Sequence, residues 1–281
     1  MNAAQIMALV TARGFRFSKT HGQNFLIDEE VLGEIVAASG ATGQDYALEI
    51  GPGAGALTHV LASEVKKLIA VEIDVQLIDM LQTVMQGQAN LRIVQGDVLK
   101  IDLAQLVQQE FGEAPFHVLS NLPYSQTTPI ISMLLHSTLP IASMTLMMQK
   151  EAAQRLIALP STPQYGPMAV FAYGDYEVSP CFDVEAQCFI PPPQVVSSVM
   201  YLRRRGESCL NYPDRKHFVR TVQAGFLMRR KMLSNNLVSA FALSRAQAIE
   251  VIERCGLRSD IRGEALTPEQ FALLSTTLYE M

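Results

Sequence analysis

Short apolar runs alternate with amphipathic stretches through the first two-thirds of the chain. The runs have the length of buried strands, and the stretches between them show the apolar spacing of helices. Such alternation predicts a parallel sheet covered by helices on both faces. The predicted strands span 46–50, 67–73, 91–95, 116–120 and 143–148, and the predicted helices span 55–63, 75–86, 102–110, 128–136 and 149–158.

After residue 170 the pattern changes. Residues 173–182 and 195–202 have the spacing of two further strands, which an antiparallel arrangement would accommodate. From Asp214 onward the spacing is helical only, and Pro268 is a start signal for the last helix. We therefore predict a sheet region followed by a helical region.

The two regions are separated by the linker-like segment 204–212. We predict one domain at residues 1–206, which carries the sheet, and a small all-α domain at residues 207–281.

Composition narrows the class of protein. Apolar residues make up 49% of the 281 positions and charged residues 17%, which excludes a disordered chain. The four cysteines form no CxxC pair and the five histidines have no close ligand spacing. We therefore expect no metal site and no disulfide framework, and a reducing compartment fits this cysteine usage.

An uncharged stretch at residues 114–149 is long enough to cross a membrane. Prolines and polar residues interrupt it, so that it contains no 18-residue apolar helix. The first residues lack the basic start and long apolar run of a signal peptide. We expect a soluble, cytoplasmic protein without a membrane partner.

Charge is distributed unevenly along the chain. The net charge is −5, yet residues 203–262 hold 13 basic and 5 acidic side chains, whereas residues 1–202 hold 9 basic and 19 acidic ones. A basic segment on an acidic protein predicts an anionic partner for that segment, although a solvated helical surface would have the same composition.

A glycine-rich turn follows the first predicted strand of the sheet. Gly51 and Gly53 lie where the chain turns into a helix, so the backbone can approach a ligand closely. Glu72 ends the next strand, where a carboxylate can accept hydrogen bonds from ribose hydroxyls. With Ala56 the turn also satisfies the dinucleotide pattern G-x-G-x-x-G/A, so NAD is a possible ligand at this point.

Two later strand ends favour a different chemistry. Asp97 ends the third strand, in a position suited to an adenine amino group. Asn121, Leu122, Pro123 and Tyr124 follow the fourth strand. An amide followed by a rigid proline and an aromatic ring is suited to a flat base with an exocyclic amine.

These motifs give the chain a resemblance to the S-adenosylmethionine-dependent rRNA adenine N6-dimethyltransferases, and its C-terminal motifs resemble the small-subunit branch, the KsgA family. The resemblance spans residues 19–271. Its motifs are HGQNFL (21–26), EIGPGAG (49–55), GDVL (96–99), NLPY (121–124), FIPPPQVVSS (189–198), GFLMRRKMLSNNL (225–237) and IRGEALTPEQF (261–271).

The resemblance implies a fold and an activity. The fold is a Rossmann-like methyltransferase sheet with a small helical C-terminal domain that binds rRNA. The reaction transfers methyl groups from S-adenosylmethionine to two adjacent adenosines near the 3′ end of 16S rRNA in the 30S subunit. We expect a monomer that acts in small-subunit biogenesis.

The resemblance also assigns residues. Asn24 and Leu26 would close over the methionine end of the cofactor, the turn at Gly51 and Gly53 would pass beneath it, and Asn121 would contact both cofactor and target. Glu72 would hold the ribose and Asp97 the adenine.

The remaining assignments concern the RNA. Asn121 and the Leu122 carbonyl would accept hydrogen bonds from the target amine, and Tyr124 and Phe189 would contact the target base. For Arg229, Arg230 and Lys231 we expect a helix on which two side chains reach phosphates, while the third packs or pairs with the catalytic domain.

The sequence departs from the family pattern at two positions. Gln194 stands where the family often has a basic residue, and Ser125 where it often has a second aromatic residue. Both departures bear on RNA affinity or base stacking.

Three other functions are alternatives to the small-subunit rRNA dimethyltransferase. They are a large-subunit rRNA methyltransferase, a ribosome-assembly factor with secondary catalysis, and an NAD-dependent oxidoreductase.

Overall fold

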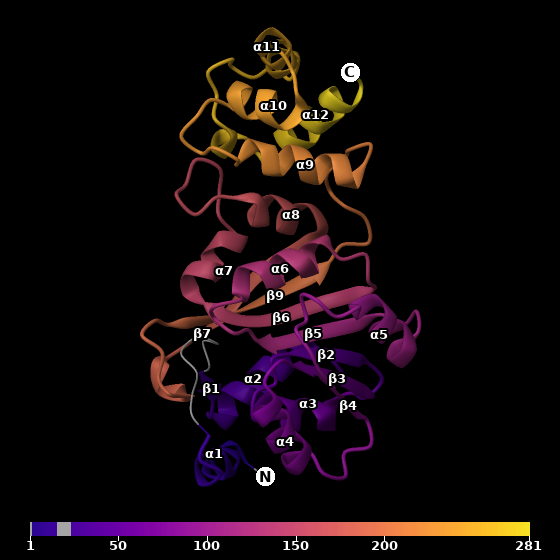
Figure 1. Ribbon diagram of the computed structural model, residues 1–281, viewed down its shortest axis with the longest axis vertical. Coiled ribbons are helices and arrows are strands. Elements are labelled where there is room, and N and C mark those ends of the chain that lie inside the picture. The colour runs from indigo at the N-terminus through magenta and orange to yellow at the C-terminus, as the bar shows by residue number, and fades with distance from the viewer. Residues whose placement is uncertain (1, 16–23) are drawn as a thin grey trace. The chain divides into compact units, whose positions relative to one another are not determined.

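The computed structural model describes residues 2–15 and 24–281, and its central feature is a seven-stranded sheet (Figure 1). The strands of this sheet, in spatial order, are β4 (Leu91–Gln95), β3 (Lys67–Glu72), β2 (Tyr46–Ile50), β5 (Phe116–Asn121), β6 (Ile141–Gln149), β9 (Ser197–Arg204) and β7 (Tyr176–Val184). The predicted α/β fold is confirmed, with each of the five strands predicted before residue 170 present in the sheet.

The order of the strands determines where a ligand can bind. The chain leaves β2 toward β3 and β4 and then returns to add β5 on the other side of β2, so the direction of winding reverses between β2 and β5. All four neighbouring pairs from β4 to β6 are parallel. In parallel sheets of this kind, ligands bind beyond the carboxyl ends of the strands at such a reversal point.

β9 is antiparallel to β6, as the sequence allowed. Its first residue, Ser197, lies opposite Gln149, the last residue of β6. The start of β9 is therefore at the same edge of the sheet as the carboxyl ends of the parallel strands.

Helices between the strands bury apolar faces against the sheet, and their starts are encoded locally. The Asp28 carboxylate accepts hydrogen bonds from the first backbone N–H groups of α2, and Asp74 and Asp102 cap α4 and α5 in the same way. α2 packs on β5, β6 and β9, and α3 packs on β3. The helices between strands are α2 (Glu29–Ser39), α3 (Ala56–Glu64), α4 (Val75–Val84), α5 (Leu103–Phe111), α6 (Thr127–His136) and α7 (Lys150–Leu156), and α1 (Ala3–Ala12) precedes the first strand.

The chain folds into two compact units. The first unit comprises residues 1–153 and 178–204, and the second comprises residues 154–177 and 205–281. The second unit is helical: its helices are α8 (Pro167–Asp175), α9 (Arg215–Gly225), α10 (Leu233–Phe241), α11 (Arg245–Arg254) and α12 (Pro268–Tyr279). A single division after residue 206 differs from this arrangement, because residues 154–177 group with the C-terminal helices.

Two predicted elements are corrected by the structure. Residues 173–175 belong to α8 instead of a strand, because Pro167 starts a helix whose Val170 and Phe171 are buried. Residues 226–231 form a turn instead of a helix, since α9 ends at Gly225 and α10 begins at Leu233.

A short two-stranded sheet accompanies the main one. β1 (Phe25–Leu26) pairs with β8 (Phe189–Ile190) in antiparallel fashion, with Leu26 opposite Phe189. Within the described ranges, no helix is both long and apolar enough to span a membrane.

Candidate active site

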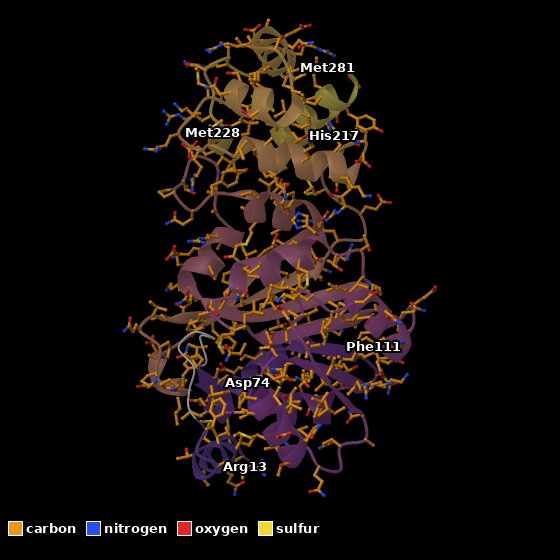
Figure 2. The ribbon with its side chains drawn as sticks, in the orientation of Figure 1. Arg13, Asp74, Phe111, His217, Met228 and Met281 are labelled. Carbon is orange, nitrogen blue, oxygen red and sulfur yellow. The ribbon has the colours of Figure 1, made fainter. Side chains whose placement is uncertain are left out.

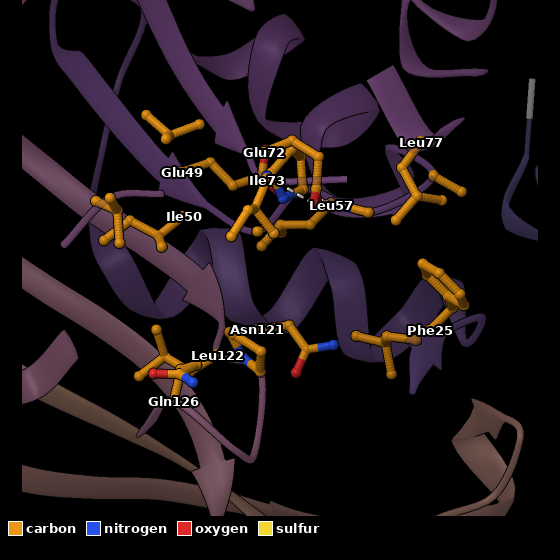
Figure 3. Close-up of a pocket in the computed structure, with 18 of the residues that line it drawn as sticks. Phe25, Glu49, Ile50, Leu57, Glu72, Ile73, Leu77, Asn121, Leu122 and Gln126 are labelled. Carbon is orange, nitrogen blue, oxygen red and sulfur yellow. Dashed lines mark hydrogen bonds between the residues drawn. The ribbon is translucent and has the colours of Figure 1, made fainter. Parts of the chain in front are cut away.

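A pocket lies beyond the carboxyl ends of the parallel strands of the first unit (Figure 3). It has an empty volume of about 1100 Å³ including its open mouth. The sequence-predicted residues that line it are Asn24, Leu26, Gly51, Gly53, Glu72, Asp97, Asn121, Leu122 and Tyr124. These residues come from five separate segments of the chain, and the strand order explains why they meet.

The glycine turn after β2 adopts a backbone that ordinary residues avoid. Gly51, Gly53 and Gly55 have φ values of 69°, 58° and 94°. A Cβ atom at Gly53 would lie 2.6 Å from the ring of Phe25. Glycine is therefore required at this position both by the backbone conformation and by the ring packed against it.

Glu72 holds this turn in place from the end of β3. Its Oε2 accepts a hydrogen bond from Gly53 N at 3.0 Å, and its Oε1 accepts from Ile73 N and Asp74 N, each at 2.9 Å. Burial raises the pKa of this carboxyl, while the backbone N–H groups act in the opposite direction. A carboxylate offers about four acceptor positions. Glu72 therefore retains capacity for a ligand hydroxyl.

Glu49 is a second buried carboxyl in the pocket wall, and it is not among the residues predicted from the sequence. It lies on β2 and is 1% exposed, and no described residue hydrogen-bonds its Oε2. Burial raises its pKa to about 8; the Thr58 hydroxyl opposes this shift and the Glu72 carboxyl adds to it. A glutamate inside the apolar run of a central parallel strand is the sequence signal that could have identified it.

Asp97 lies at the pocket, and both oxygens of its carboxylate have partners in the turn that follows β4. Its Oδ1 accepts a hydrogen bond from Leu99 N at 3.0 Å, and its Oδ2 pairs with Lys100 at 3.2 Å. The carboxylate is held at the end of β4 by the turn that follows it. Exposed apolar side chains of Ile73 and Leu99 line the pocket nearby.

Asn121 ends β5, and its amide projects into the pocket (Figure 3). Its Nδ2 donates a hydrogen bond to the Asn24 carbonyl oxygen at 3.1 Å. A carbonyl oxygen can only accept, so this contact fixes which end of the amide carries the NH₂ group. Among residues 2–15 and 24–281 the Asn121 Oδ1 has no donor, which leaves it available to a ligand amine.

Two neighbours of Asn121 complete this side of the pocket. Leu122 N donates to the Met147 carbonyl oxygen at 3.0 Å, which ties the segment to β6. Tyr124 is half-buried, and its hydroxyl lies 2.5 Å from Ser197 Oγ. Burial raises the pKa of Tyr124, so its phenol stays protonated in the physiological range.

Phe189 was predicted to contact the target base, but it lies in the apolar core instead of the pocket lining. Its side chain is 2% exposed in the apolar core beside Leu26, and it is not part of the pocket lining. Its place opposite Leu26 in the β1–β8 pair explains this burial. In this arrangement the ring supports the wall that carries Leu26 instead of offering a face to a base.

Asn24 and Leu26 lie at the pocket as predicted from the HGQNFL motif. The first three residues of that motif, 21–23, lie outside the described residues. Asn24 contributes its backbone carbonyl to Asn121, and Leu26 is buried within β1.

Three consecutive basic residues occupy the turn of the second unit that also carries Met228 (Figure 2). Arg229 is engaged within this unit: it pairs with Glu264 at 3.3 Å and donates to the Pro163 carbonyl oxygen at 3.0 Å. Arg230 and Lys231 are exposed, and within the described part of the chain neither forms an ion pair.

The turn is held by close backbone packing. A Cβ atom at Gly263 would lie 2.0 Å from the Gly225 carbonyl oxygen, which also accepts a hydrogen bond from Asn236 Nδ2 at 3.0 Å. Leu233 N donates to the Ile261 carbonyl oxygen at 2.8 Å. The Arg230 and Lys231 charges are thus presented from a fixed turn.

The described ranges contain no group of three His, Cys, Asp or Glu side chains that could hold a metal ion. The polar groups of the pocket are carboxylates, an amide and a phenol. They are suited to hydrogen-bonding a nucleoside.

Comparison with known proteins identifies the family. The family model described as ribosomal RNA adenine dimethylase matches residues 14–278. The chain belongs to this family. A ribosomal RNA small subunit methyltransferase A from Shouchella clausii is 41% identical over 279 residues, which covers 98% of this chain and 94% of that protein.

Solved structures agree with the adenine dimethylase fold. A dimethyladenosine transferase from Plasmodium falciparum has a TM-score of 0.72 at 22% identity, covering 89% of this chain and 95% of that one. The 23S rRNA methyltransferase ErmE has a TM-score of 0.65 at 25% identity, covering 91% of this chain and 99% of that one. The Rossmann-like methyltransferase fold is therefore confirmed. Membership of the adenine dimethylase family shows that the oxidoreductase alternative is wrong.

Proposed function

We propose that this adenine dimethylase transfers methyl groups from S-adenosylmethionine to N6 of two adjacent adenosines near the 3′ end of 16S rRNA. The product in the 30S subunit is N6,N6-dimethyladenosine. The observation that carries the proposal is the Asn121 amide, whose free Oδ1 faces the pocket beside the half-buried ring of Tyr124. The enzyme acts as a monomer in the cytoplasm, during assembly of the small subunit.

The pocket fits S-adenosylmethionine. Gly51 and Gly53 have the positive φ values that let the backbone pass close beneath a ligand. Glu72 has acceptor capacity for the ribose hydroxyls, and Asp97 lies where it can accept from the adenine amine. Asn24 and Leu26 would close over the methionine end. When bound, the cofactor supplies a methyl group already activated on its sulfonium.

Activation of the target amine falls to Asn121 and Leu122. The N6 lone pair of adenine is delocalised into the ring, which makes the amine a poor nucleophile. The Asn121 Oδ1 and the Leu122 backbone carbonyl would accept hydrogen bonds from the N6 amine and would favour a pyramidal nitrogen whose lone pair is available for methyl transfer. Positioning supplies most of the rate. No strong general base is required, because the methylated nitrogen is cationic and releases its proton to solvent.

Tyr124 holds the target base by stacking. Its phenol stays protonated and its ring is half-buried, so the ring offers a flat apolar face at the pocket. An adenosine must leave its own stack to reach this face, which is the usual requirement for chemistry on a base.

Arg230 and Lys231 contact rRNA phosphates. Both are exposed and both lack ion-pair partners among the described residues. Arg229, the third basic residue, instead fixes the turn through Glu264 and Pro163. We thus assign two phosphate contacts to this turn.

The small subunit is favoured over the large subunit by sequence similarity. The curated small-subunit relative is 41% identical to this chain, compared with 25% for the 23S enzyme ErmE. An assembly role that persists without methylation is compatible with the exposed basic turn. A variant that binds 30S subunits but does not methylate them separates that role from catalysis.

Mass spectrometry of small-subunit rRNA tests the proposal. Cells that lack this gene should contain unmodified adenosines near the 3′ end, and cells that carry it should contain two adjacent dimethyladenosines. A gene whose loss leaves the dimethyladenosines unchanged would overturn the proposed function.

A further inference from the structure

The hydroxyl of Tyr124 is anchored by a strand that lies far from the NLPY motif in sequence. Its oxygen lies 2.5 Å from Ser197 Oγ, and Ser197 is 0% exposed. Ser197 is the first residue of β9, 73 positions beyond Tyr124. A tyrosine at an open pocket and a fully buried serine are thus joined by one hydrogen bond.

The direction of β9 accounts for this contact. Because β9 is antiparallel to β6, its first residue lies at the carboxyl edge of the sheet, opposite Gln149. Lys150 N donates to the Val196 carbonyl oxygen at 3.0 Å, which fixes the segment that enters β9. The sheet therefore positions the Ser197 hydroxyl at the edge of the pocket.

The next residue has a different partner. Ser198 is 5% exposed, and its hydroxyl donates to Asp183 Oδ1 at 2.5 Å, while Lys150 pairs with Asp183 Oδ2 at 2.6 Å. Successive residues of a strand point to opposite faces of the sheet. Two adjacent buried serines thus serve separate contacts, and only Ser197 reaches a residue of the pocket.

We propose that Ser197 is a positioning residue for methyl transfer. The tyrosine hydroxyl lies on the long axis of its side chain, so a hydrogen bond at that end fixes the direction of the axis. The direction decides where a stacked adenine sits relative to Asn121. Ser197 thereby aligns the base with the methyl donor without touching either. This inference rests on the proposed function, in which Tyr124 stacks on the target.

Replacement of the hydroxyl tests the inference. Ser197→Ala should lower the single-turnover rate of methyl transfer to undermethylated 30S subunits about 10-fold, because a small misplacement of the reacting groups is costly. Its affinities for S-adenosylmethionine and for 30S subunits should stay unchanged. Ser198→Ala is the matched control: it removes a neighbouring buried hydroxyl bond, and its rate should remain within about two-fold of the wild type.

A double-mutant cycle identifies the partner. Tyr124→Phe keeps the ring and removes the same hydrogen bond, so it should show a similar loss, and the Ser197→Ala/Tyr124→Phe double variant should show no further loss. The double variant leaves neither hydroxyl unpaired, so it should be at least as stable as the single variants.

A wild-type rate for Ser197→Ala, or losses that multiply in the double variant, would overturn the positioning role. An equal loss in Ser198→Ala would also overturn it, because the effect would then be structural. Absence of transfer by the wild-type enzyme would contradict the proposed function instead, so the two failures are distinguishable.

Discussion

The pocket of the first unit and the basic turn of the second present their functional side chains in opposite ways. Glu72, Asn121 and Tyr124 are buried or half-buried, and each is held by a hydrogen bond to a distant segment. Arg230 and Lys231 are exposed, with no ion-pair partner among the described residues. Chemistry on a base requires fixed groups, whereas binding to a phosphate backbone requires accessible charge.

The same difference separates the expected effects of substitutions. Loss of a pocket residue should impair a defined step while leaving 30S binding intact. Loss of Arg230 or Lys231 should weaken binding and change its dependence on salt. A pocket substitution that weakens 30S binding, or a turn substitution that lowers only the rate of methyl transfer, would contradict this distinction.

The largest effect is expected for Asn121→Ala. It removes the acceptor for the target amine and should lower the single-turnover rate at least ~100-fold, comparable to loss of one oriented polar group at a reacting centre. Binding to 30S subunits, measured by co-sedimentation, should not change. Gln105→Ala, at an exposed position of α5, serves as the amide control. A rate within a few-fold of the wild type would contradict the assigned role.

Glu72→Ala should mainly weaken the binding of S-adenosylmethionine. The ribose loses its acceptor, and the N–H groups of Gly53, Ile73 and Asp74 lose theirs, at a cost of about 1–3 kcal/mol for the buried Gly53 N–H. Calorimetry should show at least ~10-fold weaker binding of S-adenosylmethionine. Glu64→Gln, on the exposed end of α3, should bind like the wild type. An unchanged affinity in Glu72→Ala would reject the ribose contact.

Salt titration of 30S binding tests the role of the basic turn. Each phosphate contact contributes about −0.7 to −0.9 to the slope of log K against log salt. Arg230→Ala/Lys231→Ala should therefore flatten the slope for 30S binding by about 1.5. Arg229→Ala should mainly lower thermal stability, because its partners are Glu264 and Pro163. Parallel lines for the double variant and the wild type would dismiss the phosphate contacts.

The effect expected for Glu49 is not on catalysis or binding but on the pH dependence of stability. Its folded pKa of about 8 lies above its ordinary value, so the folded protein binds an extra proton between those pH values. Stability from the neutral carboxyl is fully present at low pH and is lost as the pH rises toward 8, by up to about 1.4 kcal/mol per unit.

Thermal unfolding between pH 5 and pH 8 provides the measurement. Glu49→Gln cannot ionise, so its stability relative to the wild type should increase with pH, whereas Glu64→Gln should follow the wild type. A constant difference between Glu49→Gln and the wild type would show that Glu49 does not titrate in this way.

The parallel strands and most pocket residues were accessible from the sequence because local patterns encode them. The apolar runs mark β2 to β6, and parallel strand ends must meet at one edge. The helix α2 was missed, although Asp28 as a cap, the apolar spacing of Leu32 and Ile35, and Gly40 at its end are ordinary signals.

Other features depend on tertiary packing and have no local signature. Phe189 is buried because β8 pairs with β1, a contact between segments more than 160 residues apart. The bond between Tyr124 and Ser197 depends on the antiparallel direction of β9, and residues 154–177 join the second unit through packing on α9 and α12. The turn at 226–231 follows from the close approach of Gly225 and Gly263.

Methylation of purified subunits tests the central claim most directly. Undermethylated 30S subunits and, separately, 50S subunits are incubated with the enzyme and labelled S-adenosylmethionine, and the rRNA is analysed by mass spectrometry. The wild type should produce two adjacent N6,N6-dimethyladenosines near the 3′ end of 16S rRNA, and Asn121→Ala should produce neither. Label on 23S rRNA instead, or equal label with the wild type and Asn121→Ala, would contradict the account.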